Sequence, residues 1–333
     1  MVTVAIPTLN ASLPLRECLS ALERQTFRDF RVVVIDNSGK QLAREIAERW
    51  QGVEVIENPS NVGFGTAVNQ AFRGRQSAYF ATLNDDAVAQ PEWLAALVGA
   101  MESGTGAGMC ASQIRLAGGT QLDSAGMLIS SDGTSKQRGH LSSPAKYTAA
   151  EEVLLPSACA ALYRRQMLEQ IGFFDEDFFL YCEDTDLGLR ARWAGWSCLY
   201  APGAVVEHRY SETAGADSPL KAYYVERNRL FVLLKSFPLR LMARAPLATC
   251  QRYFWHLVSA TGGRGSAGRF RSRNAGVWRL VYIVVRAHLV LLKHGGRLLR
   301  QRREIRRSAR IDAREFERLV TAHFIGPREV AAL

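Results

Sequence analysis

Short apolar runs and amphipathic stretches alternate along the first part of the chain. The apolar runs are nearly continuous, as expected for parallel strands that helices cover on both faces. The stretches between them have apolar residues at helical spacing, so the order predicts a doubly wound α/β core with a mostly parallel sheet. We expect strands at Val2–Ile6, Arg31–Ile35, Val53–Ile56 and Ala78–Leu83, and helices at Leu13–Gln25, Leu42–Trp50 and Gly65–Arg73.

The pattern is less regular from residue 118 to residue 150. Glycine, serine and threonine are frequent there, as in Gly118-Gly119 and Ser142-Ser143-Pro144, so we expect turns or a mobile excursion rather than core. Regular structure returns afterwards, with a helix from Cys182 to Ala194 that Gly195 caps and a strand at Trp196–Tyr200.

Long helical patterns rich in arginine follow Gly215. Ala222–Ser236 reads as a helix stopped by Pro238, and Gly262–Gly268 reads as a flexible break. From Val277 onward charge interrupts the apolar positions too often for a membrane-spanning helix. We expect an interfacial helix on anionic lipid, the alternative being an amphipathic helix packed on its own domain. Basic residues recur there every seven positions, at Arg279, Arg286, Lys293, Arg300, Arg307 and Arg314.

The net charge of +10 is divided unevenly along the chain. Residues 1–215 carry 18 basic and 25 acidic residues, whereas residues 216–333 carry 24 and 7. We interpret residues 1–215 as an acidic catalytic domain and residues 216–333 as a basic helical region that associates with an anionic membrane surface. No recognition motif for nucleic acid accompanies the basic residues, so nucleic acid is not an expected partner.

The six cysteines are scattered and none forms a CxxC pair. This spacing argues against a zinc site and for a reducing compartment. Met1 leads directly into Val2–Ile6 without a basic region or cleavage site, so no signal peptide is expected. We therefore expect a cytoplasmic protein.

Two acidic clusters carry the candidate chemistry. The first, Asn84-Asp85-Asp86, follows the apolar strand at the carboxyl edge of the sheet, where open α/β folds bind ligands. Adjacent carboxylates repel each other, and Mg²⁺ or Mn²⁺ relieves that repulsion. The second cluster, Glu183-Asp184, begins a helix and can supply a general base, although acidic residues are favoured at a helix start in any case.

Three further features are weaker when each is taken alone. Asp36 ends a strand and can bind a base or ribose, or else form an Asx-turn. Asn61 and Gly63 lie in a turn before a helix, where backbone amides can approach a phosphate, but the turn is neither a P-loop nor a GxGxxG motif. His208 can complete a metal site, although a lone histidine is more often structural.

Taken in order, these motifs resemble glycosyltransferase family 2, whose members have a GT-A fold. The resemblance is closest to the bacterial rhamnosyltransferase and galactofuranosyltransferase branch, and it covers about residues 2–235. The motifs are TVAIPTLN at Thr3–Asn10, CLSALERQTFRDF at Cys18–Phe30, VVIDNSG at Val33–Gly39, NPSNVGFGTAVN at Asn58–Asn69, LNDD at Leu83–Asp86 and CEDTDLGLRARWA at Cys182–Ala194.

The resemblance implies a role for each candidate residue. Pro7, Thr8 and Asp36 would lie around the nucleotide base, and Asn61 and Gly63 near the ribose and diphosphate. Asn84-Asp85-Asp86 matches the family's DxD motif, with Asp86 as metal ligand, Asp85 near the donor, and Asn84 in place of the first aspartate. Asp184 matches the general base of the ED motif, beside Glu183, and His208 matches a histidine that binds metal in some members. The loop from Asp123 to Gly139 would lie near the acceptor.

The implied reaction is an inverting, metal-dependent transfer of a sugar from a nucleotide diphosphate donor to a saccharide or lipid-linked saccharide. L-Rhamnose from dTDP-rhamnose is the first expectation, and galactofuranosyl or other hexosyl transfer from a UDP-sugar is the alternative. A non-catalytic nucleotide-sugar or membrane-binding scaffold is a second alternative. A nucleotidyltransferase is disfavoured because its glycine- and lysine-rich loop is absent near the N-terminus. The expected location is the inner face of the cell membrane, as a peripheral protein of cell-surface polysaccharide synthesis.

Overall fold

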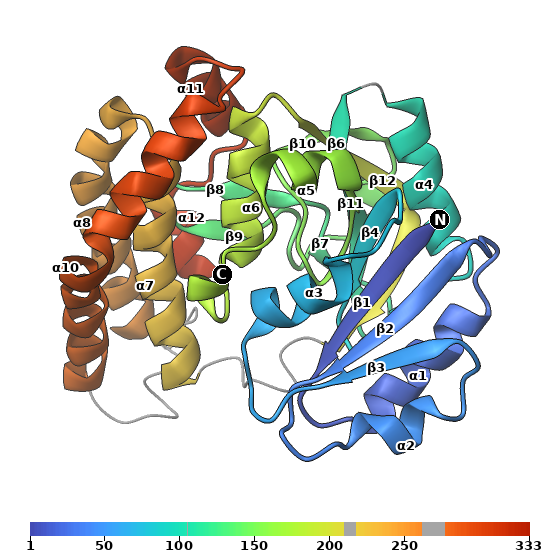
Figure 1. Ribbon diagram of the computed structural model, residues 1–333. Helices are drawn as coiled ribbons and strands as arrows, with labels where there is room; N and C mark the ends of the chain where they lie inside the picture. Colours follow the sequence, from blue (N-terminus) through green and yellow to red (C-terminus); the bar gives the residue numbers. More distant parts are fainter. Residues whose placement is uncertain (105, 210–217, 262–276) are drawn as a thin grey trace. The chain divides into compact units, whose positions relative to one another are not determined.

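The computed structural model describes residues 1–104, 106–209, 218–261 and 277–333, which fold into two compact units (Figure 1). The first unit comprises Met1–Met127, Gln137–Phe179 and the strand that follows Trp196. The second comprises Leu128–Lys136, Leu180–Gly195 and the described residues from Ser218 onward. The expected domain boundary at residue 215 and the expected break at Gly262–Gly268 lie outside the described residues.

A mixed sheet forms the centre of the first unit (Figure 1). The strand order is β10-β12-β6-β11-β4-β1-β2-β3, with β5 paired to β12 and β7 paired to β6. Among the described strands, β1, β2, β3, β4, β6 and β12 run in one direction, which confirms the mostly parallel sheet. The strands are β1 (Val2–Thr8), β2 (Phe30–Asp36), β3 (Val53–Glu57), β4 (Tyr79–Leu83), β5 (Ala87–Ala89), β6 (Ala107–Leu116), β7 (Leu122–Ser124), β10 (Glu151–Val153), β11 (Ala160–Arg164) and β12 (Ser197–His208).

Helices of the first unit pack on this sheet through apolar positions at helical spacing. In α1 these positions include Leu15, Leu19 and Leu22, all buried in the core that also contains Val4 and Val34 of the sheet. The helices are α1 (Leu13–Glu23), α2 (Ala43–Ala47), α3 (Phe64–Phe72), α4 (Trp93–Ser103) and α5 (Arg165–Ile171), with short 3₁₀ turns η1 (Pro144–Lys146) and η2 (Glu176–Phe178). The predicted alternation of strands and helices is confirmed, with small shifts at the ends.

The expectation of turns rather than core for residues 118–150 is wrong in part. The segment contains β7 and the hairpin β8 (Met127–Ile129) and β9 (Ser135–Gln137), and several of its polar residues are buried. Asp123 and Asp132 are almost inaccessible to solvent. Both carboxylates are paired with cationic side chains, which is why charged residues of this polar segment can be buried.

The second unit is helical apart from the β8–β9 hairpin. Helix α7 packs along α10, and α8 packs against α12. Trp193 of α6 stacks on Phe316 of α11 at 4.3 Å between ring centroids, and its Nε1 donates to the Ser236 carbonyl. The helices are α6 (Glu183–Trp193), α7 (Pro219–Ser236), α8 (Leu239–Thr261), α10 (Val277–Arg307), α11 (Ala313–Ala322) and α12 (Pro327–Ala332).

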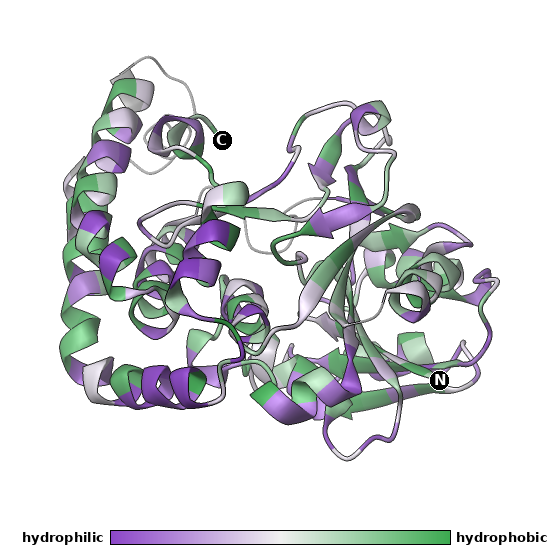
Figure 2. Cartoon of the chain, turned by 90° about the horizontal axis from the view of Figure 1, so that it is seen from above, coloured by the Kyte–Doolittle hydropathy of each residue, from purple (hydrophilic) through white to green (hydrophobic). Residues whose placement is uncertain are grey.

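Polar and apolar residues are interleaved along the helices of the second unit (Figure 2). Within the described ranges, no helix combines the length and the apolar character needed to cross a bilayer.

A buried network of ion pairs ties the hairpin to two helices of the second unit. Arg252 of α8 contacts Asp132 at 2.6 Å and Glu226 at 2.9 Å, and Arg229 of α7 also pairs with Glu226. Burial alone would raise the pKa of Glu226, but the guanidinium groups of Arg252 and Arg229 hold that pKa well below its usual range. The ionised carboxylate is therefore part of the native state.

We expect Glu226→Gln to destabilise the protein by about 3–5 kcal/mol at pH 7, because two buried guanidinium groups lose their shared carboxylate. A carboxyl group with a depressed folded pKa stabilises the fold above its unfolded pKa, and this contribution is lost as pH falls through the folded value. The difference from wild type should therefore shrink below about pH 4. Thermal melts across pH measure it. The exposed Glu304→Gln serves as control and should change stability by at most about 0.5 kcal/mol; an equal loss in both variants would contradict the role of the network.

Candidate active site

Asn84, Asp85 and Asp86 lie directly after β4, at the carboxyl edge of the sheet. The Asn84 backbone amide donates to the Cys159 carbonyl at 2.8 Å, which holds the turn against the segment before β11. Asp86 is 6% exposed, whereas Asn84 and Asp85 are half-buried. The turn therefore presents three polar side chains at the edge where parallel strands end.

His208, the last residue of β12, joins Asp86 to a second carboxylate. Its Nε2 lies 3.2 Å from Asp86 Oδ1 and 3.4 Å from the Asn84 side-chain amide. Its Nδ1 lies 2.9 Å from Asp123 Oδ2. Asp123 also contacts His140, at 3.3 Å between Oδ1 and Nδ1. The structure thus brings Asn84, Asp86 and His208 together, with Asp123 and His140 behind the histidine.

The charges of the acidic and histidine side chains in this series of contacts stabilise one another. Burial would raise the pKa of Asp123, but its contacts with His140 and His208 lower that pKa to about 2. Burial would lower the pKa of His208, yet the neighbouring Cys159, Asp123 and Asp86 raise it well above its usual value. The ionised form of Asp123 fixes the orientation of the imidazole, with Nδ1 toward Asp123 and Nε2 toward Asp86.

This donor set fits a divalent cation. A carboxylate and an imidazole nitrogen suit Mn²⁺, and a histidine whose second nitrogen meets a carboxylate is a common arrangement in metal sites. Among the residues that the structure describes, no group of three His, Cys, Asp or Glu side chains forms a complete metal site. Asp86 and His208 would accordingly need ligands from a bound diphosphate, which is a usual way for proteins to bind Mg²⁺ with nucleotides.

Asp85 makes a separate contact, with Thr8 at the end of β1. Thr8 Oγ1 donates to Asp85 Oδ2 at 2.5 Å and accepts from the Ala11 amide at 3.1 Å. Burial raises the pKa of Asp85 to about 6. Pro7 precedes Thr8 in β1 and lies opposite Ile35 of β2, so both residues adjoin the end of the neighbouring strand.

Asp36 ends β2 and forms the Asx-turn that the sequence left open as one of two interpretations. Its two oxygens accept from the Ser38 and Ala43 amides, each at 2.8 Å, and the side chain is almost fully buried. These bonds position the polar loop after β2. A contact between Asp36 and a nucleotide base stays a prediction.

Asn61 and Gly63 shape the turn before α3. Asn61 Oδ1 accepts from the Gly63 amide at 2.8 Å. Gly63 has φ of 87°, and a Cβ there would lie 2.5 Å from the Phe179 carbonyl oxygen. Only glycine fits both constraints. The proximity of this turn to a ribose or diphosphate stays a prediction.

Glu183 and Asp184 begin α6 in the second unit. Tyr181 and Cys182, just before them, both have positive φ without being glycine, and such backbone strain is concentrated at functional sites. Asn228 of α7 supports this turn, because its side-chain amide donates to the Leu180 and Tyr181 carbonyls at 2.7 Å.

The acidic residues at the start of α6 differ in their surroundings. Asp186 is buried between Arg190 and Lys235, at 2.8 and 2.6 Å. Glu183 is buried, and this burial, together with the charge of Asp184, raises its pKa well above the usual value. Asp184 is half-buried, and its Oδ1 accepts from the Thr185 amide at 2.7 Å. Of the three, Asp184 is the least buried carboxylate.

Sequence reasoning missed Asp123, His140 and Asn228 as site residues. Asp123 was expected only at the start of an acceptor loop, and it lies 85 residues from His208. No local spacing indicates such a pair. Asn228 lies in a helix that the sequence predicted, but its contact with the turn before α6 depends on how α6 and α7 pack.

We expect Glu183→Gln to stabilise the protein at pH 8. When folding raises the pKa of a carboxyl group, that group lowers the free energy of unfolding at pH values above its unfolded pKa of about 4.3. The loss grows with pH until the pH reaches the folded pKa. The gain should therefore be larger at pH 8 than at pH 5, as measured by chemical denaturation. Glu169→Gln, on the exposed surface of α5, is the control and should change stability by less than about 0.5 kcal/mol at either pH. A gain that does not depend on pH would show that Glu183 is ionised in the fold.

Curated relatives of this chain include two proteins named as rhamnosyltransferases. An N-acetylglucosaminyl-diphospho-decaprenol L-rhamnosyltransferase of Mycobacterium tuberculosis is 29% identical over 238 residues, covering 64% of this chain and 78% of the relative. The O-antigen chain rhamnosyltransferase WbaN of Salmonella anatum is 24% identical over 216 residues, covering 63% and 67%.

Solved structures agree on the fold. The mannosyltransferase PcManGT from Pyrobaculum calidifontis, in complex with GDP-Man and Mn²⁺, has a TM-score of 0.53 at 16% identity, covering 92% of this chain and 85% of that one. S. aureus TarS in complex with UDP-GlcNAc has a TM-score of 0.53 at 15% identity, covering 96% and 90%. The profile described as Glycosyl transferase family 2 matches residues 3–172, which is just over half of the chain. The chain therefore belongs to glycosyl transferase family 2 and is a glycosyltransferase.

Proposed function

We propose that the protein transfers L-rhamnose from dTDP-rhamnose to a hydroxyl group of a lipid-linked saccharide, with inversion at the anomeric carbon. The observation that carries the proposal is the buried pair of Asp86 and His208, 3.2 Å apart, with Asp123 behind the histidine. This donor set suits a divalent cation on a nucleotide diphosphate. The names of the two rhamnosyltransferase relatives support the sugar, and the first supports a lipid-linked acceptor.

Asp86 would hold the cation, Mn²⁺ or Mg²⁺, together with His208 once its Nε2 has released its proton, and with Asn84 beside them. When bound, the cation neutralises negative charge on the diphosphate as it leaves. Asp85 and Thr8 would contact the donor, and Pro7 and Asp36 the nucleotide base. Asn61 and Gly63 would orient the turn before α3 toward the ribose and diphosphate.

Asp184 would act as general base. It takes the proton from the acceptor hydroxyl while that oxygen forms a bond to the anomeric carbon and the bond from that carbon to the diphosphate oxygen breaks. One direct displacement inverts the configuration and needs no enzyme nucleophile. Burial raises the pKa of Glu183, which disfavours a second negative charge beside Asp184. The reaction would take place at the cytoplasmic face of the membrane, where a lipid-linked acceptor can be reached.

A donor panel tests the proposed sugar. With a lipid-linked N-acetylglucosaminyl diphosphate as acceptor, we expect dTDP-rhamnose to give the fastest release of nucleoside diphosphate. UDP-galactofuranose and UDP-hexoses are the competing donors. Faster turnover with one of them would show that its sugar, and not rhamnose, is the one transferred. Release of pyrophosphate instead would indicate nucleotidyl transfer. Donor binding without turnover by any pair would favour a non-catalytic scaffold.

For Asp184→Asn we expect kcat to fall at least about a hundredfold while donor affinity stays within about twofold, because general-base catalysis typically contributes that much to the rate. Initial rates and calorimetric titration with dTDP measure the two quantities. The matched control is Asp177→Asn, an exposed aspartate of η2, which should leave both unchanged. Wild-type turnover in Asp184→Asn would remove this residue from the mechanism.

Mn²⁺ binding in the presence of dTDP tests the proposed cation site independently of turnover. We expect Asp123→Asn to weaken Mn²⁺ affinity about 10–100-fold, the usual effect of removing a carboxylate that orients a metal-bound histidine. His208→Ala should weaken it at least as much. Electron paramagnetic resonance of free Mn²⁺ measures the affinity, and His288→Ala, an exposed histidine of α10, is the control. Unchanged affinity in both site variants would place the cation elsewhere.

A further inference from the structure

Helix α10 carries large apolar side chains on two opposite faces. One face packs into the second unit through Ile283, Ala287, Leu298 and Ile305, all buried. At about 100° per residue, the other apolar row lies on the far side of the helix. That row stays exposed, up to 83% at Trp278 and 84% at Leu292, and consists of Trp278, Val281, Tyr282, Val285, Leu289, Leu292 and Leu299.

A helix at the surface of a folded protein needs only one apolar face. Packing against α7 already covers the face that contains Ala287, so the exposed row adds nothing to the core. Single exposed apolar residues are ordinary, but a row that continues over several helical turns indicates a surface that binds a partner.

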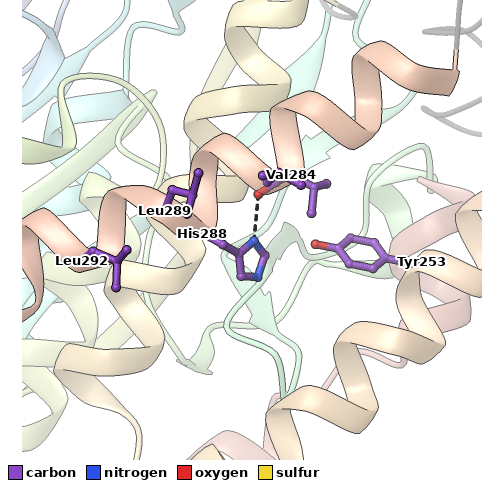
Figure 3. Close-up of a pocket in the computed structure, with 6 residues that line it drawn as sticks. Tyr253, Val284, His288, Leu289 and Leu292 are labelled. Atoms are coloured by element: carbon purple, nitrogen blue, oxygen red, sulfur yellow. Dashed lines mark hydrogen bonds between the residues drawn. The ribbon is translucent and has the colours of Figure 1, made fainter.

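A shallow apolar groove lies beside this row (Figure 3). It has a volume of about 420 Å³ and is lined by Tyr253 of α8 and by Val284, Val285, His288, Leu289 and Leu292 of α10. Next to Tyr253, α8 has three more exposed apolar residues, Phe254, Leu257 and Val258. The exposed apolar row and this groove together are called the α8–α10 face below.

Positive charge borders the α8–α10 face. Arg279, Arg286, Lys293, Arg300 and Arg307 of α10 are exposed and recur every seven residues, and Glu304 is the single acidic residue between Val277 and Arg307. Arg286 stacks on Tyr223 at 4.5 Å. Within the described part of the chain, Arg279, Lys293 and Arg300 have no ion-pair partner. These three cations are therefore available to an external anionic group.

The combination of positive charge and exposed apolar surface favours an anionic lipid bilayer over a second copy of the chain as the partner. A second copy of the chain would bring an equally basic helix to the same interface, and like charges would repel. A bilayer with anionic headgroups offers negative charge at the level of the arginines and apolar chains below them. We propose that the α8–α10 face docks on an anionic lipid bilayer, with α10 parallel to the surface and its exposed apolar row inserted at the boundary between headgroups and acyl chains.

Vesicle co-sedimentation of the full chain tests this docking without any sugar transfer, so its result is separate from that of the proposed reaction. We expect wild-type protein to bind vesicles of phosphatidylcholine and phosphatidylglycerol at 3:1, and to bind pure phosphatidylcholine at least about tenfold more weakly. Leu289→Asp combined with Leu292→Asp should weaken binding to the anionic vesicles at least about tenfold, because it places two charges in the inserted row.

A second set of variants tests how much the basic residues contribute to vesicle binding. Arg279→Gln, Lys293→Gln and Arg300→Gln together should weaken binding about a hundredfold at low salt, and should reduce its dependence on salt, since each cation near the surface contributes about fivefold. Leu13→Asp, at an equally exposed leucine of α1 in the first unit, is the control and should bind as wild type does. Binding equal to wild type in both α10 variants would overturn the proposal.

The alternative occupant, a second copy, has its own outcome. If the α8–α10 face joined two copies, wild-type protein would be a dimer by light scattering, Leu289→Asp with Leu292→Asp would be a monomer, and neither would bind vesicles. That result would overturn the proposal. A fluorescence measurement then locates the inserted row: Trp278 should be quenched by brominated lipid, and Trp278→Phe should remove that quenching. No difference in quenching between the two proteins would contradict insertion of the row.

Discussion

A carboxylate can be buried in a protein only if a cation or several hydrogen-bond donors accompany it, and this constraint organises both units. In the first unit His208 lies between Asp86 and Asp123. In the second, Arg252 and Arg229 surround Asp132 and Glu226, and Lys235 and Arg190 hold Asp186. Each group joins segments that are far apart in the sequence. The polar network therefore determines which segments pack together, in addition to the apolar core.

The same constraint gives the three acidic residues at the start of α6 different roles. Asp186 is neutralised by two cations and serves to hold α6 against α7, whereas burial and the charge of Asp184 raise the pKa of Glu183 well above its usual value. Asp184, between them, is half-buried. Three carboxylates within one helical turn thus have three different environments, and this difference is what distinguishes a structural acid from a candidate base.

The βα alternation could be predicted because each strand is an apolar run and each helix has an apolar stripe. Local motifs also placed Asp86 and His208 as candidates, but they did not indicate that Asp123 orients the histidine. The segment after residue 118 was misjudged because many of its buried residues are polar, and the burial of Asp123 and Asp132 depends on partners elsewhere in the chain. For α10, seven-residue spacing identified the basic row. Which of its two apolar faces is buried depends on the packing of α7, which periodicity alone does not contain.

The contact between His208 and Asp123 also has a consequence for how this chain can change over evolutionary time. Replacing Asp123 alone leaves Nδ1 of the buried His208 without its carboxylate partner, and replacing His208 alone leaves the buried carboxylate of Asp123 with His140 as its remaining histidine contact. A lineage that exchanges the two residues one at a time therefore passes through a less stable protein. Related chains are therefore expected to keep both residues or to exchange both, so that positions 123 and 208 vary together although 85 residues separate them.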